Sequence, residues 1–295
     1  MKYLAILILL ITLCFCCIAC SPQESVDILA TTGPVYDFTT RLCNGTGLSV
    51  SLLITENISC LHDYTLQVRQ MRLIQSADLI AISGAGLESF LDDAMYSAQH
   101  IIDASANLTL MDGHQHDHSH DHNAHAGHLH EEDPHIWLSV ENAKQMAENL
   151  CNGLSDHYPE YSEVFLQNLN ALIHELDELQ AYGEDALRDL SCRSLITFHD
   201  GFSYLAEAFD LTILTAIEEE SGSEASAAQL AALANLIHSN NIPAIFTEIN
   251  GSASAADILS AETGVKQFAL DMAISTYSYI DTMYYNINTL REALQ

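Results

Sequence analysis

Basic residues are scarce in this chain. Nine of its 295 residues are Lys or Arg, whereas 40 are Asp or Glu, which gives a formal net charge of -31. Nucleic acids and bare anionic lipid surfaces are bound through basic faces, so the composition argues against both as partners. Positively charged partners, including metal cations, are favoured instead.

Long hydrophobic runs are absent except at the amino terminus. The chain begins MKYLAILILLITLCFCCIAC, where one Lys precedes an apolar run that has the length of a secretory signal. The run ends at Cys20, before Ser21-Pro22, and this arrangement resembles a bacterial lipobox. We expect residues 1–19 to be a lipoprotein signal peptide, Cys20 to carry the lipid and residues 20–25 to form a tether. Ordinary signal cleavage with an unmodified Cys20 is the alternative.

Four cysteines remain after the export segment, namely Cys43, Cys60, Cys151 and Cys192. In the oxidising setting that export predicts, Cys43 with Cys60 and Cys151 with Cys192 are compatible disulfide pairs. Four cysteines allow three connectivities, and free thiols remain an alternative. No Cys-x-x-Cys spacing among these four favours a thiolate metal site.

The region 26–138 alternates short β-rich runs with helical patterns. Such a βαβα alternation predicts a parallel sheet and hence a first α/β lobe. The β-rich runs are residues 26–31, 48–54, 79–83 and 101–103, and the helical patterns are residues 35–42, a stretch from residue 65, and residues 87–97.

The second half of the chain begins with helices. After Phe165, leucines recur every three or four residues as far as residue 179, which predicts one amphipathic helix over residues 161–190. Residues 139–192 are therefore interpreted as a helical region with a long linking helix, and residues 193–295 as a second α/β lobe. We expect its strands at 195–198, 211–216, 244–248 and 267–270, and its helices at 201–209, 225–239, 253–263 and 279–294.

Eight histidines are concentrated between residues 113 and 131, among Gly, Asp and Asn. Neutral imidazole suits Zn, Cu and Ni, and this composition opposes packing as a helix or strand. The segment is interpreted as an auxiliary metal-collecting loop and not as a purification tag, because it lies mid-chain and leads directly into DPHIWL. Its histidines are His114, His116, His118, His120, His122, His125, His128 and His130.

Three further histidines, His62, His135 and His199, stand apart from this loop at predicted strand ends or loop-helix junctions. Any one of them alone is more often a hydrogen-bonded structural residue than a metal ligand. Together they predict a Zn²⁺ site in the cleft between the lobes, because three imidazoles plus a carboxylate or water commonly bind zinc. Asp63 and Asp200 directly follow two of them and are interpreted as caps of the next helices.

Short motifs that extend from one lobe to the other carry a family resemblance. They are HDY at 62–64, AD at 77–78, Gly-x-Gly-x-Glu at 84–88, DPHIW at 133–137, FHD at 198–200 and IFTE at 245–248. In combination, over essentially the whole mature chain, they resemble the metal-binding lipoproteins that serve ABC importers of zinc and manganese, the cluster A-I or ZnuA/TroA-like group. The resemblance implies two similar α/β lobes with parallel sheets, joined by one long helix, and the metal site in the cleft between them.

The resemblance also implies a ligand set. The family's zinc-type members have His at the third ligand position and its manganese-type members have Glu; this chain has His199, and imidazole favours Zn²⁺ over the oxygen-preferring Mn²⁺. The fourth ligand is usually acidic, which corresponds to Asp271 here. The chain departs from the family at Met272, where Pro is common. Glu248 is the rival fourth ligand, or a carboxylate that orients a ligating imidazole.

The sequence therefore predicts a lipid-anchored, extracytoplasmic zinc receptor on the bacterial cell membrane that delivers Zn²⁺ to the permease of an ABC-type importer and catalyses no reaction. We expect a monomer that binds no nucleic acid. A receptor of the same family for manganese or another divalent metal is one alternative. A zinc-dependent hydrolase is the alternative from another class, but the chain has no His-Glu-x-x-His segment and no nucleophile elbow.

Overall fold

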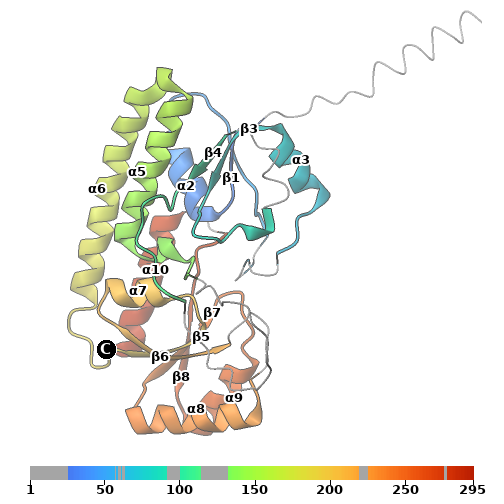
Figure 1. Cartoon of the computed structure of the whole chain (residues 1–295). Helices are drawn as coiled ribbons and strands as arrows, with labels where there is room; N and C mark the ends of the chain where they lie inside the picture. The colour runs from blue at the N-terminus through green and yellow to red at the C-terminus, as the bar shows by residue number, and fades with distance from the viewer. Residues whose placement is uncertain are drawn as a thin grey trace, which may run out of the picture.

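A computed structural model describes residues 26–295, apart from residues 57, 59–60, 62–63, 92–99, 114–131, 219–224 and 276–277. Two four-stranded sheets built from parallel strand pairs form the centres of two lobes, which lie one above the other in Figure 1. The predicted fold class of two α/β lobes is confirmed.

The sheet of the first lobe has the strand order β2-β1-β3-β4. The inner strand β1 lies between β2 and β3, and its Ile28 is in register with Val50 of β2 and with Leu79 of β3. Near-continuous apolar runs build this sheet because helices cover parallel sheets on their faces. The elements of this lobe are β1 (Val26–Ala30), α2 (Gly33–Leu42), β2 (Val50–Leu52), α3 (Val68–Ser76), β3 (Ala77–Ile82), the 3₁₀ helix η1 (Ser89–Leu91) and β4 (Ile101–Asp103).

The sheet of the second lobe has the order β6-β5-β7-β8, and its central strand β7 is buried along its whole length. The helix α8 begins at a capping box between Ser226 and Gln229. The helix α9 ends at Thr263, and its C-cap is Gly264, whose φ of 74° suits a left-handed cap. The elements are β5 (Ser194–His199), α7 (Ser203–Ala208), β6 (Thr212–Glu218), α8 (Ala227–Asn240), β7 (Ala244–Glu248), α9 (Ser254–Thr263) and β8 (Lys266–Leu270).

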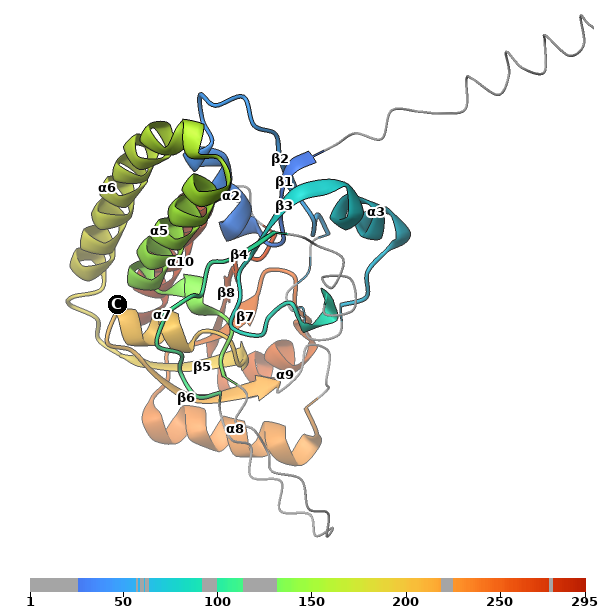
Figure 2. The same ribbon diagram turned by 45° about the horizontal axis from the view of Figure 1, so that its top comes forward.

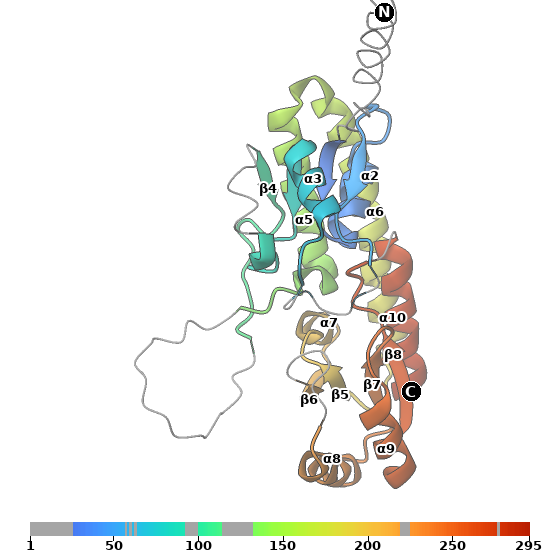
Figure 3. The ribbon, with the colours of Figure 1, turned by 90° about the vertical axis from the view of Figure 1, so that its right-hand side faces the viewer.

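Three long helices form one flank of the molecule: α5 (Val140–His157), α6 (Ser162–Ala186) and α10 (Tyr279–Leu294). Figures 2 and 3 show that α6 runs beside α5 in the first lobe and reaches α10 in the second. The predicted linking helix is confirmed, although it ends at Ala186, four residues before the expected residue 190. The short 3₁₀ helices η2 (Ile136–Leu138) and η3 (Pro159–Tyr161) precede α5 and α6.

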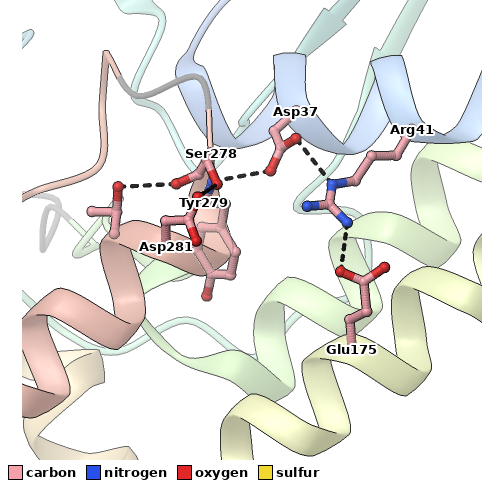
Figure 4. A network of polar contacts seen from close by, with 7 residues as sticks. Asp37, Arg41, Glu175, Ser278, Tyr279 and Asp281 are labelled. Carbon is pink, nitrogen blue, oxygen red and sulfur yellow. Dashed lines mark hydrogen bonds and ion pairs between the residues drawn. The ribbon is translucent and has the colours of Figure 1, made fainter.

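The lobes share one apolar core, which includes Phe38 of α2, Leu176 of α6 and Ile287 of α10. A polar network reinforces their contact (Figure 4): Asp37 accepts a hydrogen bond of 3.0 Å from the backbone N–H of Tyr279, and Arg41 bridges Asp37 and the Glu175 carboxylate of α6. Both lobes are therefore tied to the same helical flank. In the described part of the chain, no helix has the length and apolar character that crossing a bilayer requires.

The suggested disulfide pairs are wrong, because Cys43, Cys151 and Cys192 are free thiols. Burial raises the pKa of the Cys43 thiol to about 12, so this side chain stays protonated and behaves as a small apolar residue. The helix expected over residues 87–97 is represented by η1, and residues 92–99 lie outside the described part of the chain, as does Cys60.

Candidate metal site between the two sheets

His199 is the last residue of β5, and Glu248 is the last residue of the neighbouring strand β7. The carboxyl ends of parallel strands meet at one edge of a sheet, so the two side chains come together at the edge that faces the first lobe. His199 Nδ1 lies 3.4 Å from Glu248 Oε1, and the two side chains are 4% and 7% exposed. The Glu248 carboxylate is thus positioned to orient the imidazole ring.

His135 reaches the same place from the other side of the cleft. It immediately precedes η2, and its Nδ1 lies 2.8 Å from Asp133 Oδ1. Burial alone would raise the pKa of Asp133, but the hydrogen bond and charge of His135 outweigh it and hold the pKa below its usual range. Asp133 is therefore a carboxylate acceptor for the imidazole N–H.

The two imidazoles meet edge to face. Their ring centroids are 5.2 Å apart at an interplanar angle of 90°, and both residues are almost completely buried. In each ring the Nδ1 atom is directed at a carboxylate. A proton on Nδ1 leaves a lone pair on Nε2, which is the form of imidazole that binds a metal ion.

Trp137 connects this site to the second lobe. Its indole lies 5.6 Å from the His135 ring and donates a hydrogen bond of 2.7 Å from Nε1 to the backbone carbonyl of Met272. The Trp137 carbonyl in turn accepts a 2.7 Å bond from the Tyr279 hydroxyl. Trp137 is the one tryptophan of the chain, so its fluorescence reports on the surroundings of His135.

Gly201 is required by close packing against His199. A Cβ at this position would lie 2.7 Å from Cδ2 and 2.9 Å from Nε2 of His199, and 2.7 Å from the terminal methyl of Met272. Such separations are far below ordinary van der Waals contact, so a larger side chain would displace the imidazole or the thioether. The ring of His199 is thus confined between Glu248 and the Gly201 backbone.

The two rival acidic residues border the same hollow, which is lined by Ile58, Glu248, Ile249, Asn250, Asp271 and Met272. Asp271 follows β8, and its Oδ1 accepts a 2.8 Å hydrogen bond from the backbone N–H of Ala273. Asn286 of α10 bonds both the N–H and the carbonyl of Asp271. The backbone at Asp271 is therefore fixed, with the carboxylate at the rim of the hollow.

The structure thus brings His135, His199 and Glu248 together and places Asp271 beside them. His62, the eight loop histidines and Cys20 lie outside the described residues, so their proposed roles stay predictions. Among the described residues, no group of three or more His, Cys, Asp or Glu side chains gathers closely enough to hold a metal ion. The interpretation of Asp200 as a helix cap is wrong, because the N-cap of α7 is Phe202.

Tyr204 of α7 holds the base of the histidine loop. Its hydroxyl accepts a bond of 2.9 Å from the Met111 N–H and donates one of 3.1 Å to the Asp133 carbonyl. The Asp133 N–H also bonds the Met111 carbonyl at 2.9 Å. The described residues on either side of 114–131 are therefore joined to each other next to His135.

Glu88 closes a second buried polar cluster, at the carboxyl ends of β1 and β3. Its carboxylate accepts bonds from the Thr31 hydroxyl and from the N–H groups of Ser83 and Gly84, at 2.6, 2.7 and 3.0 Å. Gly84 has a φ of 81°, and a Cβ there would lie 1.9 Å from Asp103 Oδ1, which explains the first glycine of the Gly-x-Gly-x-Glu motif. The Glu of this motif thus fixes the loop after β3.

We expect stability to depend on pH through Glu88. Burial raises the pKa of its carboxyl from 4.5 to about 7, so the folded state retains a proton that the unfolded chain loses. Stability should therefore fall by a few kcal/mol, relative to a Glu88→Gln variant, as the pH rises from about 4.5 to about 7. Urea unfolding at a series of pH values measures the difference. Glu292→Gln, on exposed α10 surface, is the control, and parallel curves for wild type and Glu88→Gln would contradict the expectation.

Comparison with known proteins identifies the family. The family model described as "ZnuA: Zinc-uptake complex component A periplasmic" matches residues 28–293. The zinc-binding lipoprotein AdcA of Streptococcus pneumoniae R6 is 32% identical over 291 residues, which cover 93% of this chain and 58% of that protein. This chain thus spans less than two thirds of that relative's length.

Solved structures agree with the family match. A crystal structure of ZnuA superposes with a TM-score of 0.81 at 25% identity and covers 92% of this chain and 100% of its own. The Zn(II)-bound ZnuA-like domain of Streptococcus pneumoniae AdcA has a TM-score of 0.76 at 28% identity, with coverage of 92% and 99%. The resemblance inferred from the motifs is confirmed, and the chain belongs to the ZnuA family of periplasmic zinc-uptake components.

Proposed function

We propose that this protein is an extracytoplasmic zinc receptor that delivers Zn²⁺ to the permease of an ABC-type importer and catalyses no reaction. The observation that carries the proposal is the meeting of His135 and His199 in the cleft, with a carboxylate at the Nδ1 atom of each ring. Carboxylate–imidazole pairs of this kind support zinc ligands in proteins. The relatives named above are described as zinc-binding or zinc-uptake proteins, which agrees with the proposal.

The ligand set that we propose is His62, His135, His199 and Asp271. Imidazole nitrogen is a preferred ligand of Zn²⁺, and one carboxylate completes a four-coordinate site. Glu248 is assigned the orienting role, because its Oε1 faces the Nδ1 atom of His199. The cargo is thus held by residues from both lobes, since His135 precedes α5 and His199 ends a strand of the second sheet.

The lobes are expected to rock by a small amount when metal binds. Trp137, Tyr279 and Asp37 form hydrogen bonds across the lobe contact, and α6 accompanies both lobes. Wide opening would break these bonds and expose the shared core. We propose that the protein works as a monomer anchored by lipid on Cys20 and that the permease drives release of the metal.

The histidine loop is proposed to collect zinc at the rim of the cleft. Tyr204 joins its two ends beside Asp133, so captured metal is held close to His135 at a high effective concentration. Deletion of residues 113–131 should therefore lower zinc uptake when zinc is scarce and leave one tight site intact.

Uptake of radioactive zinc by cells that carry wild type, the loop deletion or His135→Ala tests both proposals. We expect the deletion to match wild type at ample zinc, whereas His135→Ala should fail at every zinc concentration that requires the receptor. If the deletion removed the tight site, the separate role of the loop would be wrong. If His135→Ala supported normal uptake at scarce zinc, the receptor site itself would be misplaced.

A further inference from the structure

Met272 stands at the candidate site with a side chain that the zinc chemistry does not require. It is 3% exposed and lines the hollow together with Glu248 and Asp271. A Cβ placed on Gly201 would lie 2.7 Å from the terminal methyl of Met272 and 2.9 Å from His199 Nε2, so these two groups are neighbours. The terminal methyl of the Met272 thioether is therefore close to the Nε2 edge of the His199 imidazole, and the sulfur is one bond from that methyl.

The position of Met272 is fixed from several directions. Its carbonyl accepts the Trp137 Nε1–H bond at 2.7 Å, and the preceding residue, Asp271, is bonded to Asn286. The absence of a side chain at Gly201 leaves the space that the thioether and the imidazole share. A flexible, polarisable side chain is thus confined beside the buried imidazole of His199.

We propose that the cleft also binds Cu(I), with the Met272 thioether sulfur as a ligand beside the His135 and His199 imidazoles. The inference rests on the proposed function, because it uses the same cleft. Thioether sulfur is a soft ligand that selects Cu(I) and contributes little to Zn²⁺, which is served by imidazole and carboxylate. Met272 is then a residue that determines which metal ions the protein accepts.

The test compares Cu(I) and Zn²⁺ binding in wild type and in Met272→Leu. Leucine has a similar volume and no sulfur, so packing in the hollow is retained. Met146→Leu is the matched control, since Met146 is a fully buried methionine of α5. Cu(I) is supplied anaerobically with excess bicinchoninate as a competing chelator, and Zn²⁺ with a competing zinc dye.

Trp137 fluorescence is the readout for both metals. Because the Trp137 and His135 ring centroids are 5.6 Å apart, the signal follows metal near the cleft. Each variant is also measured after deletion of residues 113–131, so that metal captured by the histidine loop does not contribute. We expect wild type and Met146→Leu to bind Cu(I) in the cleft and Met272→Leu to bind it at least about tenfold more weakly, with zinc affinity unchanged.

Each other outcome has a definite meaning. Equal Cu(I) affinity in wild type and Met272→Leu would overturn the inference and leave the zinc receptor intact. Equal weakening of both metals would also overturn it, because Met272 would then act through packing alone. If neither metal changed the Trp137 signal of wild type, both the inference and the proposed function would fail.

Discussion

Replacement of His199 by alanine is expected to weaken zinc binding by at least about a hundredfold, which exceeds the 10- to 100-fold loss usual when a group that orients a ligand is removed. The ring is buried at the end of β5, with Nδ1 facing Glu248 and its Nε2 edge beside Gly201 and Met272. Its removal deletes one proposed ligand and takes away the imidazole ring that the Glu248 carboxylate faces. Competitive titration with a zinc dye measures the change.

His174→Ala is the matched control for this experiment. His174 lies on α6, its side chain is 75% exposed, and its Nε2 atom lies 3.6 Å from Glu178 Oε1. We expect this variant to bind zinc as wild type does and both variants to unfold at similar urea concentrations. Wild-type zinc affinity in His199→Ala would show that the cleft imidazoles are not the tight site.

Replacement of Trp137 by alanine is expected to lower the free energy of unfolding by about 3–5 kcal/mol. The indole is fully buried in the core that the lobes share, and its Nε1–H bonds the Met272 carbonyl across the lobe contact. The substitution leaves a cavity and a buried carbonyl that loses its donor, and each effect is destabilising. Urea unfolding followed by circular dichroism measures the loss.

Leu166→Ala provides the control for Trp137→Ala. Leu166 is a residue of α6 that is 56% exposed, so its truncation removes little buried area and should change stability by less than about 0.5 kcal/mol. A loss below about 1 kcal/mol in Trp137→Ala would contradict the view that η2 joins the lobes through a packed core.

The sequence predicts the long and strongly patterned elements well. The strand β7 and the helix α10 have the predicted bounds, residues 244–248 and 279–294. A short apolar run defines the strand, and apolar residues that recur with the helical period define the helix. The heptad-like leucines likewise predict α6. Motif resemblance predicts the family, and with it the arrangement of two lobes.

The supporting residues of the site could not be predicted in the same way. Asp133 belongs to the DPHIW motif at residues 133–137, yet nothing in the sequence shows that its carboxylate turns back to His135 Nδ1. The contacts of Gly201 and Met272 with His199 depend on the packing of two strand ends that are about 70 residues apart in sequence. Local patterns carry no information about such distances.

The disulfide pairs failed for a similar reason. Cys151 lies on the buried face of α5, whereas Cys192 follows α6 and its sulfur contacts the backbone of Ser194. Spacing along the chain favours a pair, but both cysteines are free thiols, and the Cys192 sulfur contacts the backbone of Ser194 instead. The position of Asp200 shortly before a predicted helix likewise favours a capping role. The N-cap of α7 is Phe202, however, two residues after Asp200.

The most direct test of the central claim is a crystal structure of the protein with one equivalent of zinc, with anomalous diffraction recorded at the zinc absorption edge. We predict one strong anomalous peak between His135 Nε2 and His199 Nε2, with His62 and Asp271 as the remaining ligands. A peak bound by the histidine loop, with no density between the two imidazoles, would contradict the account and identify the loop as the tight site.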